Sequence, residues 1–246
     1  MKIIIHGLGR LGLAVAGLAP EGSVACAIDP HAAATPLFPI HKNLGDCGQK
    51  ADVIIDCSHA VAVANLLRLA KIPLVICTTG LDKETLDLID WAKGHIPIFL
   101  SANMSLGVNL AAGLAESAAK SLNSKGFDIE ILEAHHNQKL DAPSGTAMML
   151  ADRINQGVGG KYEYVYDRSQ YLRKRGGGEI GISAIRGGTI VGEHTIIFAG
   201  HDEVIEITHK ALSRDIFARG ALAAANFIKG KAPGLYGMQD MLNLGE

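Results

Sequence analysis

The segment EAHHNQKLDAPSGTA, residues 133–147, gathers side chains that can move protons and hold anions. It contains two adjacent histidines, then Lys139, then a Pro-Ser-Gly turn that opens an apolar run. Such a turn predicts the start of a helix, whose first amides, here those of Gly145 and Thr146, can bind an anion. Lys139 precedes the turn closely enough for its ammonium to reach the same anion, and an imidazole nearby can transfer a proton. This combination suits reduction of a small carboxylate substrate, because hydride transfer to an unsaturated ring leaves a centre that needs a proton.

The two histidines, His135 and His136, are poor candidates for a metal site. Adjacent residues on a strand point to opposite faces of a sheet, so the pair cannot readily chelate one ion. The sequence also has no HExxH motif. An isolated His-His pair is more simply interpreted as one histidine hydrogen-bonded in the core beside a solvated Lys139, but the helix start next to it favours the catalytic interpretation. We predict no metal.

A GxGxxG motif follows the first apolar run and opens an apolar helix. Its residues are Gly7, Leu8, Gly9, Arg10, Leu11 and Gly12. The spacing is weak alone, but within a strand–turn–helix unit it predicts a dinucleotide site. Gly7 permits the tight turn, Gly9 admits the pyrophosphate close to the main chain, and Gly12 lets helix and strand pack, while the helix N-terminus faces the phosphates.

Asp29 ends the next apolar run, where an acid is expected to bond the adenosine ribose. A carboxylate repels the 2′-phosphate of NADP, so Asp29 favours NADH; an ordinary strand-end turn residue is the alternative. Small residues that close two further predicted strands are expected to leave room for the nicotinamide and to bond its carboxamide, with ordinary loops as the alternative. They are Cys77, Thr78, Thr79, Ser101, Ala102, Asn103 and Met104.

The elements that must position these motifs follow from the hydrophobic pattern. Continuous apolar runs alternate with helix-compatible stretches over the first hundred residues, as in a doubly wound parallel sheet. The predicted strands are 2–7, 24–29, 51–58, 72–80 and 96–103, and the predicted helices are 10–19, 60–71 and 83–94.

The pattern changes after Asn103. We predict a helix over 105–123, a strand over 127–139, a helix after the PSGT turn, a polar glycine-rich linker at 173–178, strands at 179–187, 188–200 and 203–211, and a helix over 215–229. The fold class is therefore α/β, a Rossmann-like doubly wound parallel sheet plus a second α+β domain with a mixed or antiparallel sheet. We predict a dinucleotide-binding domain of residues 1–104 with 214–246 and a second domain of residues 105–213.

The composition of the chain narrows the range of possible partners. A net charge of −2 argues against nucleic acid as the main partner, and no apolar run approaches the length of a membrane span. The start of the chain is too short and too glycine-rich for a signal peptide. Four cysteines without CxxC spacing predict small buried residues in a reducing compartment, by default the cytoplasm, and neither a disulfide framework nor a metal site.

The segment 133–147 resembles the signature of the dihydrodipicolinate reductase family, from the diaminopimelate route to lysine in bacteria and plants. Further segments similar to the family occur in the family's order, so that the resemblance covers nearly the whole chain. They are TTG at 78–80, SANMSLGVN at 101–109, IVGEHT at 190–195 and EITHKALSR at 206–214. The resemblance implies NAD(P)H-dependent reduction of 4-hydroxy-tetrahydrodipicolinate, a small dicarboxylate, by a homotetramer built through the second domain.

The resemblance also implies roles for individual residues. His135 corresponds to the histidine that handles the proton, and Lys139 to the lysine that acts as donor and carboxylate partner. His136, Ser144, Gly145 and Thr146 fall where the family binds substrate, and residues 7–12, 29, 77–79 and 101–104 fall where it binds the coenzyme. Cys77 stands where a glycine is common, and the glycine turn is about a residue shorter than in many members, which leaves the choice between NADH and NADPH open.

Two other functions fit parts of the sequence. One is a different Rossmann-type reductase, such as an amino-acid or sugar dehydrogenase, although PSGT behind HHxxK is not the pattern of those enzymes. The other is a redox-sensing, dinucleotide-binding regulator, which should carry a DNA-binding helix pair or a basic face. No such feature stands out in the sequence.

Overall fold

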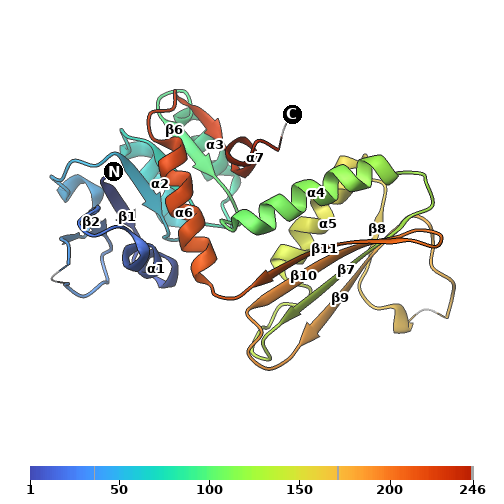
Figure 1. Cartoon of the computed structure of the whole chain (residues 1–246). Helices are drawn as coiled ribbons and strands as arrows, with labels where there is room; N and C mark the ends of the chain where they lie inside the picture. The colour runs from blue at the N-terminus through green and yellow to red at the C-terminus, as the bar shows by residue number, and fades with distance from the viewer. Residues whose placement is uncertain (36, 171, 245–246) are drawn as a thin grey trace. The chain divides into compact units, whose positions relative to one another are not determined.

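A computed structural model describes residues 1–35, 37–170 and 172–244 of the chain (Figure 1). The chain divides into two compact units, the first made of Met1–Leu106 with Asp215–Glu246 and the second of Gly107–Arg214. Each unit has its own sheet and its own apolar core.

The first unit is built on a seven-stranded sheet whose strand order is β12-β6-β5-β4-β1-β2-β3 and whose pairings are all parallel. Its strands are β1 (Ile3–His6), β2 (Val24–Ile28), β3 (Ile40–His41), β4 (Val53–Asp56), β5 (Leu74–Ile76), β6 (Pro97–Leu100) and β12 (Gly234–Tyr236). Its helices are α1 (Arg10–Leu18), η1 (Leu44–Asp46), α2 (Ala60–Leu69), α3 (Lys83–Ala92), α6 (Asp215–Ile228) and α7 (Met238–Leu242).

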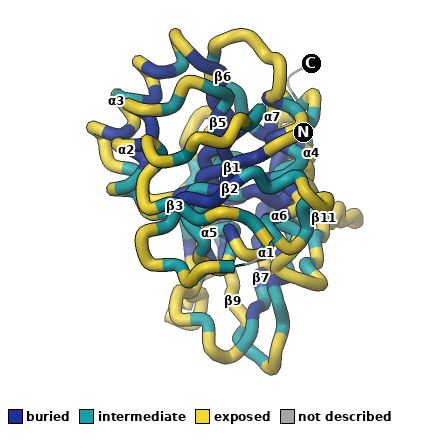
Figure 2. Tube along the Cα trace, turned by 90° about the vertical axis from the view of Figure 1, so that its left-hand side faces the viewer, coloured by how far each residue is buried: buried dark blue, intermediate teal, exposed yellow. Residues whose placement is uncertain are grey.

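The central strands of this sheet are apolar without interruption because both of their faces are covered. Ile3 and Ile5 of β1 pack on the side of α1 and α6, whereas Ile4 packs on the side of α2 and α3. The strands consequently form the buried centre of the unit (Figure 2). This arrangement confirms the predicted fold class for the first hundred residues.

The C-terminal segment adds more to this sheet than the sequence pattern predicted. Helix α6 packs so closely that a Cβ on Gly220 would lie 1.7 Å from the carbonyl oxygen of Met104. Strand β12 then pairs with β6 and becomes the seventh strand, which the apolar pattern of its three residues was too short to reveal.

The second unit is built on a five-stranded mixed sheet with the strand order β11-β10-β7-β9-β8. Its elements are α4 (Leu106–Leu122), β7 (Asp128–His135), α5 (Gly145–Gly157), β8 (Glu163–Val165), η2 (Arg168–Gln170), β9 (Glu179–Arg186), β10 (Gly192–Ala199) and β11 (Val204–Ala211). Strand β7 pairs with β10 in antiparallel and with β9 in parallel orientation. The mixed sheet confirms this part of the predicted fold class as well.

Helices α4 and α5 cover one face of the mixed sheet (Figure 1). Strand β7 shows the resulting alternation, since Ile129 and Ile131 are buried under the helices while Leu132 on the opposite face is exposed. The same alternation carries Glu133 and His135 to the covered face, which positions both for the site described below.

Residues 173–178, predicted to be a polar linker, are held against the sheet by hydrogen bonds of Arg175. The guanidinium of Arg175 bonds the carboxylates of Asp128 at 2.7 Å and Glu130 at 3.0 Å, and also the carbonyl oxygens of Ile129 and Glu179. Such long-range arginine contacts leave no trace in local composition, so the sequence pattern alone did not reveal them.

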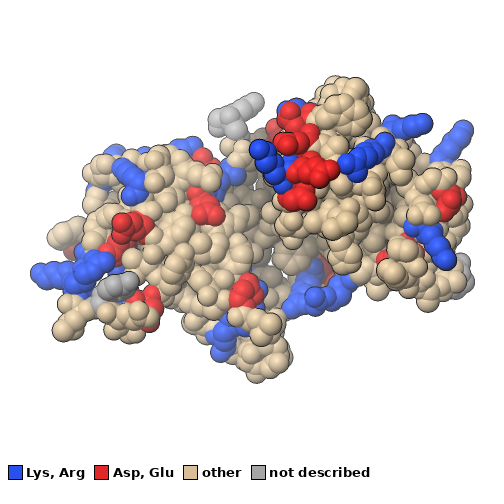
Figure 3. Space-filling model, turned by 180° about the vertical axis from the view of Figure 1, so that it is seen from behind, with Lys and Arg blue, Asp and Glu red and all other residues tan. Residues whose placement is uncertain are grey.

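Acidic and basic side chains are interspersed on the face drawn in Figure 3, as the small net charge leads one to expect. Within the described residues, no helix combines the length and the apolar character that crossing a membrane requires.

Candidate active site

A buried carboxylate and an imidazole lie side by side at the end of β7. Glu133 and His135 are two residues apart on one strand, so their side chains leave the same face of the sheet. The Nδ1 atom of His135 lies 2.6 Å from Oε2 of Glu133, whose side chain has no exposed surface.

Glu133 stays ionised although it is buried. Burial alone would raise the pKa of this carboxyl group, but hydrogen bonds from Arg186, His135 and the backbone amide of Ser144 outweigh burial and lower its pKa. Arg186 donates to both carboxylate oxygens, at 2.7 and 2.8 Å, and the Ser144 amide donates to Oε1 at 2.9 Å. A charge this deep in the protein is tolerated because each of its oxygens accepts more than one hydrogen bond.

The ionised carboxylate fixes the orientation of the His135 ring. An anionic acceptor beside Nδ1 requires that Nδ1 carry hydrogen, which leaves Nε2 as the ring nitrogen that points away from this carboxylate. Nε2 lies next to Gly192 on the neighbouring strand, where an added Cβ would come within 3.0 Å of it. Glycine at position 192 therefore leaves space beside Nε2 of the imidazole.

Ser144 joins this pair to the start of α5. Its hydroxyl oxygen caps the helix by accepting from the amide of Ala147, and it lies 3.1 Å from Nε2 of His194. The rings of His135 and His194 meet edge to face with centroids 5.2 Å apart. Burial, together with the neighbouring His135, lowers the pKa of His194 to about 4, so this second imidazole is neutral near pH 7.

The low pKa of His194 predicts an acid-labile fold. The unfolded chain takes up a proton at this residue below about pH 6.5, whereas the folded chain resists protonation down to about pH 4, so stability falls as the pH drops through this window. Replacing His194 with glutamine should remove about 2 kcal/mol of the stability difference between pH 6.5 and 4.5, measured by urea unfolding at both values. Exposed His201 gives the matched control, His201→Gln, which should leave the pH dependence unchanged; equal dependence in both variants would contradict the assignment.

A cationic site lies at the N-terminal end of α5. The ammonium of Lys139 is 2.8 Å from Oδ1 of Asp141. Hydrogen bonding to Lys139 lowers the pKa of Asp141, with a smaller contribution in the same direction from the backbone at Gly145. Close to the helix start, the ammonium thus pairs with a carboxylate that belongs to the protein itself.

The other predicted substrate residues lie in the same unit. His136, next to His135 in sequence, has a different partner, because its Nε2 lies 3.0 Å from a guanidinium nitrogen of Arg214. Thr146 follows Gly145 in the first turn of α5. Residue types alone did not single out Glu133, Arg186 or His194 as functional. For Glu133, the available signal was its two-residue spacing from His135 on a strand.

The glycine turn lies at the carboxyl end of β1, at the switch point of the sheet where β2 pairs on one side and β4 on the other. Gly7 has a φ of +89°, and a Cβ there would lie 2.8 Å from the backbone of Ser58. A Cβ at Gly12 would lie 2.0 Å from the carbonyl oxygen of Gly7. At Gly9, in contrast, a Cβ would meet nothing within 4 Å, so this turn has the compact backbone and the open outer side that a pyrophosphate needs.

Asp29 is tied to this turn. Its carboxylate accepts from the amide of Leu8 at 2.8 Å and from the amides of His31 and Ala32. Burial opposes ionisation of Asp29, but these backbone hydrogen bonds outweigh it and lower its pKa. The carboxylate is therefore negatively charged beside the turn, and it also fixes the path of the chain after β2.

The remaining predicted coenzyme residues differ in accessibility. Thr79, Ala102 and Arg10 are exposed, Leu8 and Leu11 pack partly against the core, and Ser101 and Asn103 form a local turn in which the Ser101 hydroxyl donates to the Asn103 carbonyl at 2.8 Å. The side chains of Cys77 and Met104 are buried, so they pack beneath the surface at this edge of the sheet.

Thr78 belongs to a buried network that residue patterns did not predict. Its hydroxyl donates to Asp56 at 2.5 Å, and the same carboxylate binds the Ser58 hydroxyl and Nδ1 of His6 at 2.7 Å. Asp56, His6 and Thr78 come from the carboxyl ends of three neighbouring strands, β4, β1 and β5. This network holds together the sheet edge where parallel-sheet proteins bind ligands.

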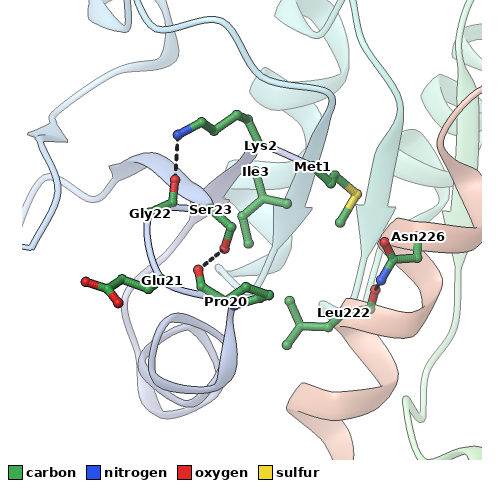
Figure 4. Close-up of a pocket in the computed structure, with 9 residues that line it drawn as sticks. All are labelled: Met1, Lys2, Ile3, Pro20, Glu21, Gly22, Ser23, Leu222 and Asn226. Carbon is green, nitrogen blue, oxygen red and sulfur yellow. Dashed lines mark hydrogen bonds between the residues drawn. The ribbon is translucent and has the colours of Figure 1, made fainter.

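Two further features lie elsewhere in the first unit. A pocket of about 430 Å³ lies at the opposite edge of the sheet, between the amino end of β1, the turn 20–23 and Leu222 of α6 (Figure 4).

The cysteines are free but not dispersed, because Cys26 and Cys47 lie close together with His41. Burial, reinforced by the Cys47 thiol, raises the pKa of Cys26 to about 12.

Comparison with known proteins shows the relatives of the chain. Models of one family match almost all of it, the dihydrodipicolinate reductase N-terminus over residues 1–104 and the dihydrodipicolinate reductase C-terminus over residues 107–242. A protein named 4-hydroxy-tetrahydrodipicolinate reductase from Caldanaerobacter subterraneus subsp. tengcongensis is 51% identical and aligns over 100% of this chain and 99% of its own length. A protein of the same name from Clostridium novyi is 43% identical, with 98% of each chain covered.

Solved structures share the fold. A dihydrodipicolinate reductase from Paenisporosarcina, solved with dipicolinate bound, has a TM-score of 0.79 at 23% identity and covers 98% of each chain. An aspartate dehydrogenase from Thermotoga maritima has a TM-score of 0.53 at 14% identity, with 94% of this chain and 97% of the other covered.

The parallel sheet with its glycine turn and the second, mixed sheet define a nicotinamide-dependent oxidoreductase. Within that class, the chain belongs to the dihydrodipicolinate reductase family. The family and the enzyme class predicted from the sequence are thereby confirmed.

Proposed function

We propose that this chain reduces 4-hydroxy-tetrahydrodipicolinate to tetrahydrodipicolinate with NAD(P)H and a proton, with loss of the 4-hydroxyl group as water, in the diaminopimelate route to lysine. Relatives of up to 51% identity bear the name of this enzyme. The structural observation that carries the proposal is the Lys139 ammonium, which pairs with a single exposed carboxylate beside the start of α5 at Gly145.

In this proposal, a substrate carboxylate takes the position that Asp141 holds. The Asp141 side chain is 58% exposed, and exposed ion pairs contribute only about 0–1 kcal/mol, so a dianionic ligand can compete for Lys139. The helix-start amides add charge-assisted hydrogen bonds without reorganisation. His136, Ser144 and Thr146 are assigned to the same substrate site.

His135 is assigned to the proton. Glu133 holds its ring by Nδ1, and Gly192 keeps the Nε2 edge clear, so Nε2 is the atom that gives up a proton to the substrate. Lys139 supports the transfer by stabilising negative charge on the substrate. In these roles, the oriented imidazole of His135 acts as a general acid.

The coenzyme is assigned to the first unit, with residues 7–12, 29, 77–79 and 101–104 around it. The open outer side of Gly9 and the start of α1 suit its pyrophosphate. When bound, the reduced nicotinamide supplies the hydride. Asp29 favours NADH, because its ionised carboxylate repels the additional phosphate of NADPH.

This preference gives a direct prediction. Asp29→Asn removes the charge while keeping an acceptor for the Leu8 amide, and it should shift the ratio of the NADPH and NADH dissociation constants by about tenfold in favour of NADPH, or about 1.4 kcal/mol. Calorimetric titration of both coenzymes measures the ratio. An unchanged ratio would assign Asp29 to the turn alone, and Asp46→Asn, on η1, is the matched control.

The second unit is assigned to substrate binding and to assembly of a homotetramer. The sheet face opposite α4 and α5 presents apolar side chains, including Leu132, Ile185 and Val204, which are 38–59% exposed. Exposed apolar side chains on this face, which also carries the charged Glu130 and Lys210, suit contact between subunits. The free cysteines fit a reducing compartment, and we assign the enzyme to the cytoplasm.

The decisive assay follows oxidation of NADH or NADPH with freshly generated 4-hydroxy-tetrahydrodipicolinate. Coenzyme oxidation that depends on this compound is the expected result. Reduction of NAD⁺ in the presence of aspartate, without activity toward the cyclic dicarboxylate, would instead support an amino-acid dehydrogenase.

A further inference from the structure

Three metal-ligating side chains meet beside β2, apart from the residues assigned above. Cys26, His41 and Cys47 each offer one donor atom, and these atoms all lie within 4.8 Å of one another. Among residues 1–35, 37–170 and 172–244, this is the one group of three or more His, Cys, Asp or Glu side chains with such spacing.

The register of the sheet brings the three together. His41 on β3 pairs with Ile28 on β2, and Cys26 lies two residues before Ile28, so Cys26 and His41 are neighbours on the same face. Cys47 follows η1 and packs against the apolar cluster that contains Cys26 and Ile28. The three donors are therefore separated by up to 21 positions in sequence but share one corner of the unit.

The surroundings of the cluster differ from those of small apolar core residues. The carboxamide oxygen of Gln49 lies 3.0 Å from Nε2 of His41 and 3.3 Å from the sulfur of Cys47. Cys26 is fully buried, whereas His41 and Cys47 are partly exposed, so the cluster has a dry inner side and an outer side open to solvent. The Gln49 oxygen can serve as a fourth donor, and the open side gives an ion a route from solvent. Both are features of a site that binds an ion.

We propose that Cys26, His41 and Cys47 bind a thiophilic divalent cation such as Zn²⁺ and that the ion fastens residues 40–47 to β2. Two sulfurs and one imidazole are a ligand set that zinc prefers, with water or the Gln49 oxygen in the fourth position. Ligands around one zinc lie about 3.5–4 Å apart, so small rotations of the side chains close the site. Both thiol protons pass to solvent as the two sulfur–metal bonds form, and no redox change occurs.

The benefit of such an ion follows from the local structure. Between β2 and β4, the described residues form only the two-residue strand β3 and the short turn η1. A segment with so few backbone hydrogen bonds is ordered at a high entropic cost, and a metal cross-link offsets that cost.

The test uses the full-length chain, freed of metal and kept reduced, with Co²⁺ or Zn²⁺ alone as the probe. We expect about one Co²⁺ per chain, with the intense near-ultraviolet absorption of cobalt bound to thiolate, and displacement of Co²⁺ by Zn²⁺. Cys26→Ser with Cys47→Ser should abolish this absorption, and His41→Ala should weaken binding by at least about tenfold. Cys57→Ser is the matched control, because Cys57 is a partly exposed thiol outside any three-ligand group among the described residues.

The wild-type spectrum decides the matter even if the double variant folds poorly. Cobalt that binds without the thiolate absorption, or the same absorption in the wild type and the double variant, would overturn the proposal. Retained NADH binding by each variant shows that the unit is folded. Because the readout is metal binding, its failure leaves the proposed reductase activity untouched.

Discussion

Lys139→Ala should lower kcat/KM by about 10²–10⁴-fold while leaving coenzyme affinity within about twofold of the wild type. The substitution removes the ammonium that meets the Asp141 carboxylate and that we assign to a carboxylate of the substrate. The glycine turn belongs to the other unit of the chain, so the coenzyme should bind as before. Steady-state kinetics and calorimetry with NADH measure the two effects separately.

The division of the loss between kcat and KM reports what Lys139 does. A lysine that only holds the ground-state carboxylate raises KM at constant kcat, whereas one that stabilises charge in the transition state lowers kcat as well. We expect both parameters to change. The exposed Lys125 provides the matched control, Lys125→Ala, and a Lys139→Ala enzyme as active as this control would refute the assignment.

Much of the fold could be predicted because parallel strands buried on both faces have an unmistakable pattern. The runs that contain Ile3–His6 and Val53–Asp56 are apolar at nearly every position, which only a sheet covered by helices on both sides explains. The end of β7 at His135 was harder to predict, because the polar residues after it are compatible with either a strand or a loop.

The contacts within the candidate site were less predictable than its residue types. Glu133 and Arg186 are 53 positions apart and meet because β9 lies beside β7, and strand order is not encoded in the local pattern of either strand. Cys26 and Cys47 looked dispersed for a similar reason, because contacts between segments distant in sequence bring them together. Short-range spacing identified the His-Lys-helix segment, whereas the partners of that segment required the three-dimensional structure.

Glu133→Gln tests the deepest of these contacts and should lower kcat by about 10²–10⁴-fold. The amide side chain is nearly isosteric, but it carries no charge and presents one acceptor where the carboxylate presents two. Arg186 then loses its anionic partner in a mostly buried setting, a change that costs about 3–5 kcal/mol of stability in comparable pairs. The unfolding free energy in urea should therefore fall together with kcat.

A pH profile separates a positioning role from simple loss of stability. Without the carboxylate at Nδ1, the His135 ring loses the charged acceptor that orients it, so the pH profile of kcat should differ from that of the wild type. Glu130→Gln is the matched control, because Glu130 lies on the same strand and also pairs with arginines, yet faces away from the site. It should lose stability without a shift of the profile, and Glu133→Asp should recover part of kcat by restoring the charge. If Glu133→Gln and Glu130→Gln gave the same profile, Glu133 would be a structural residue and His135 would have to be oriented by another group.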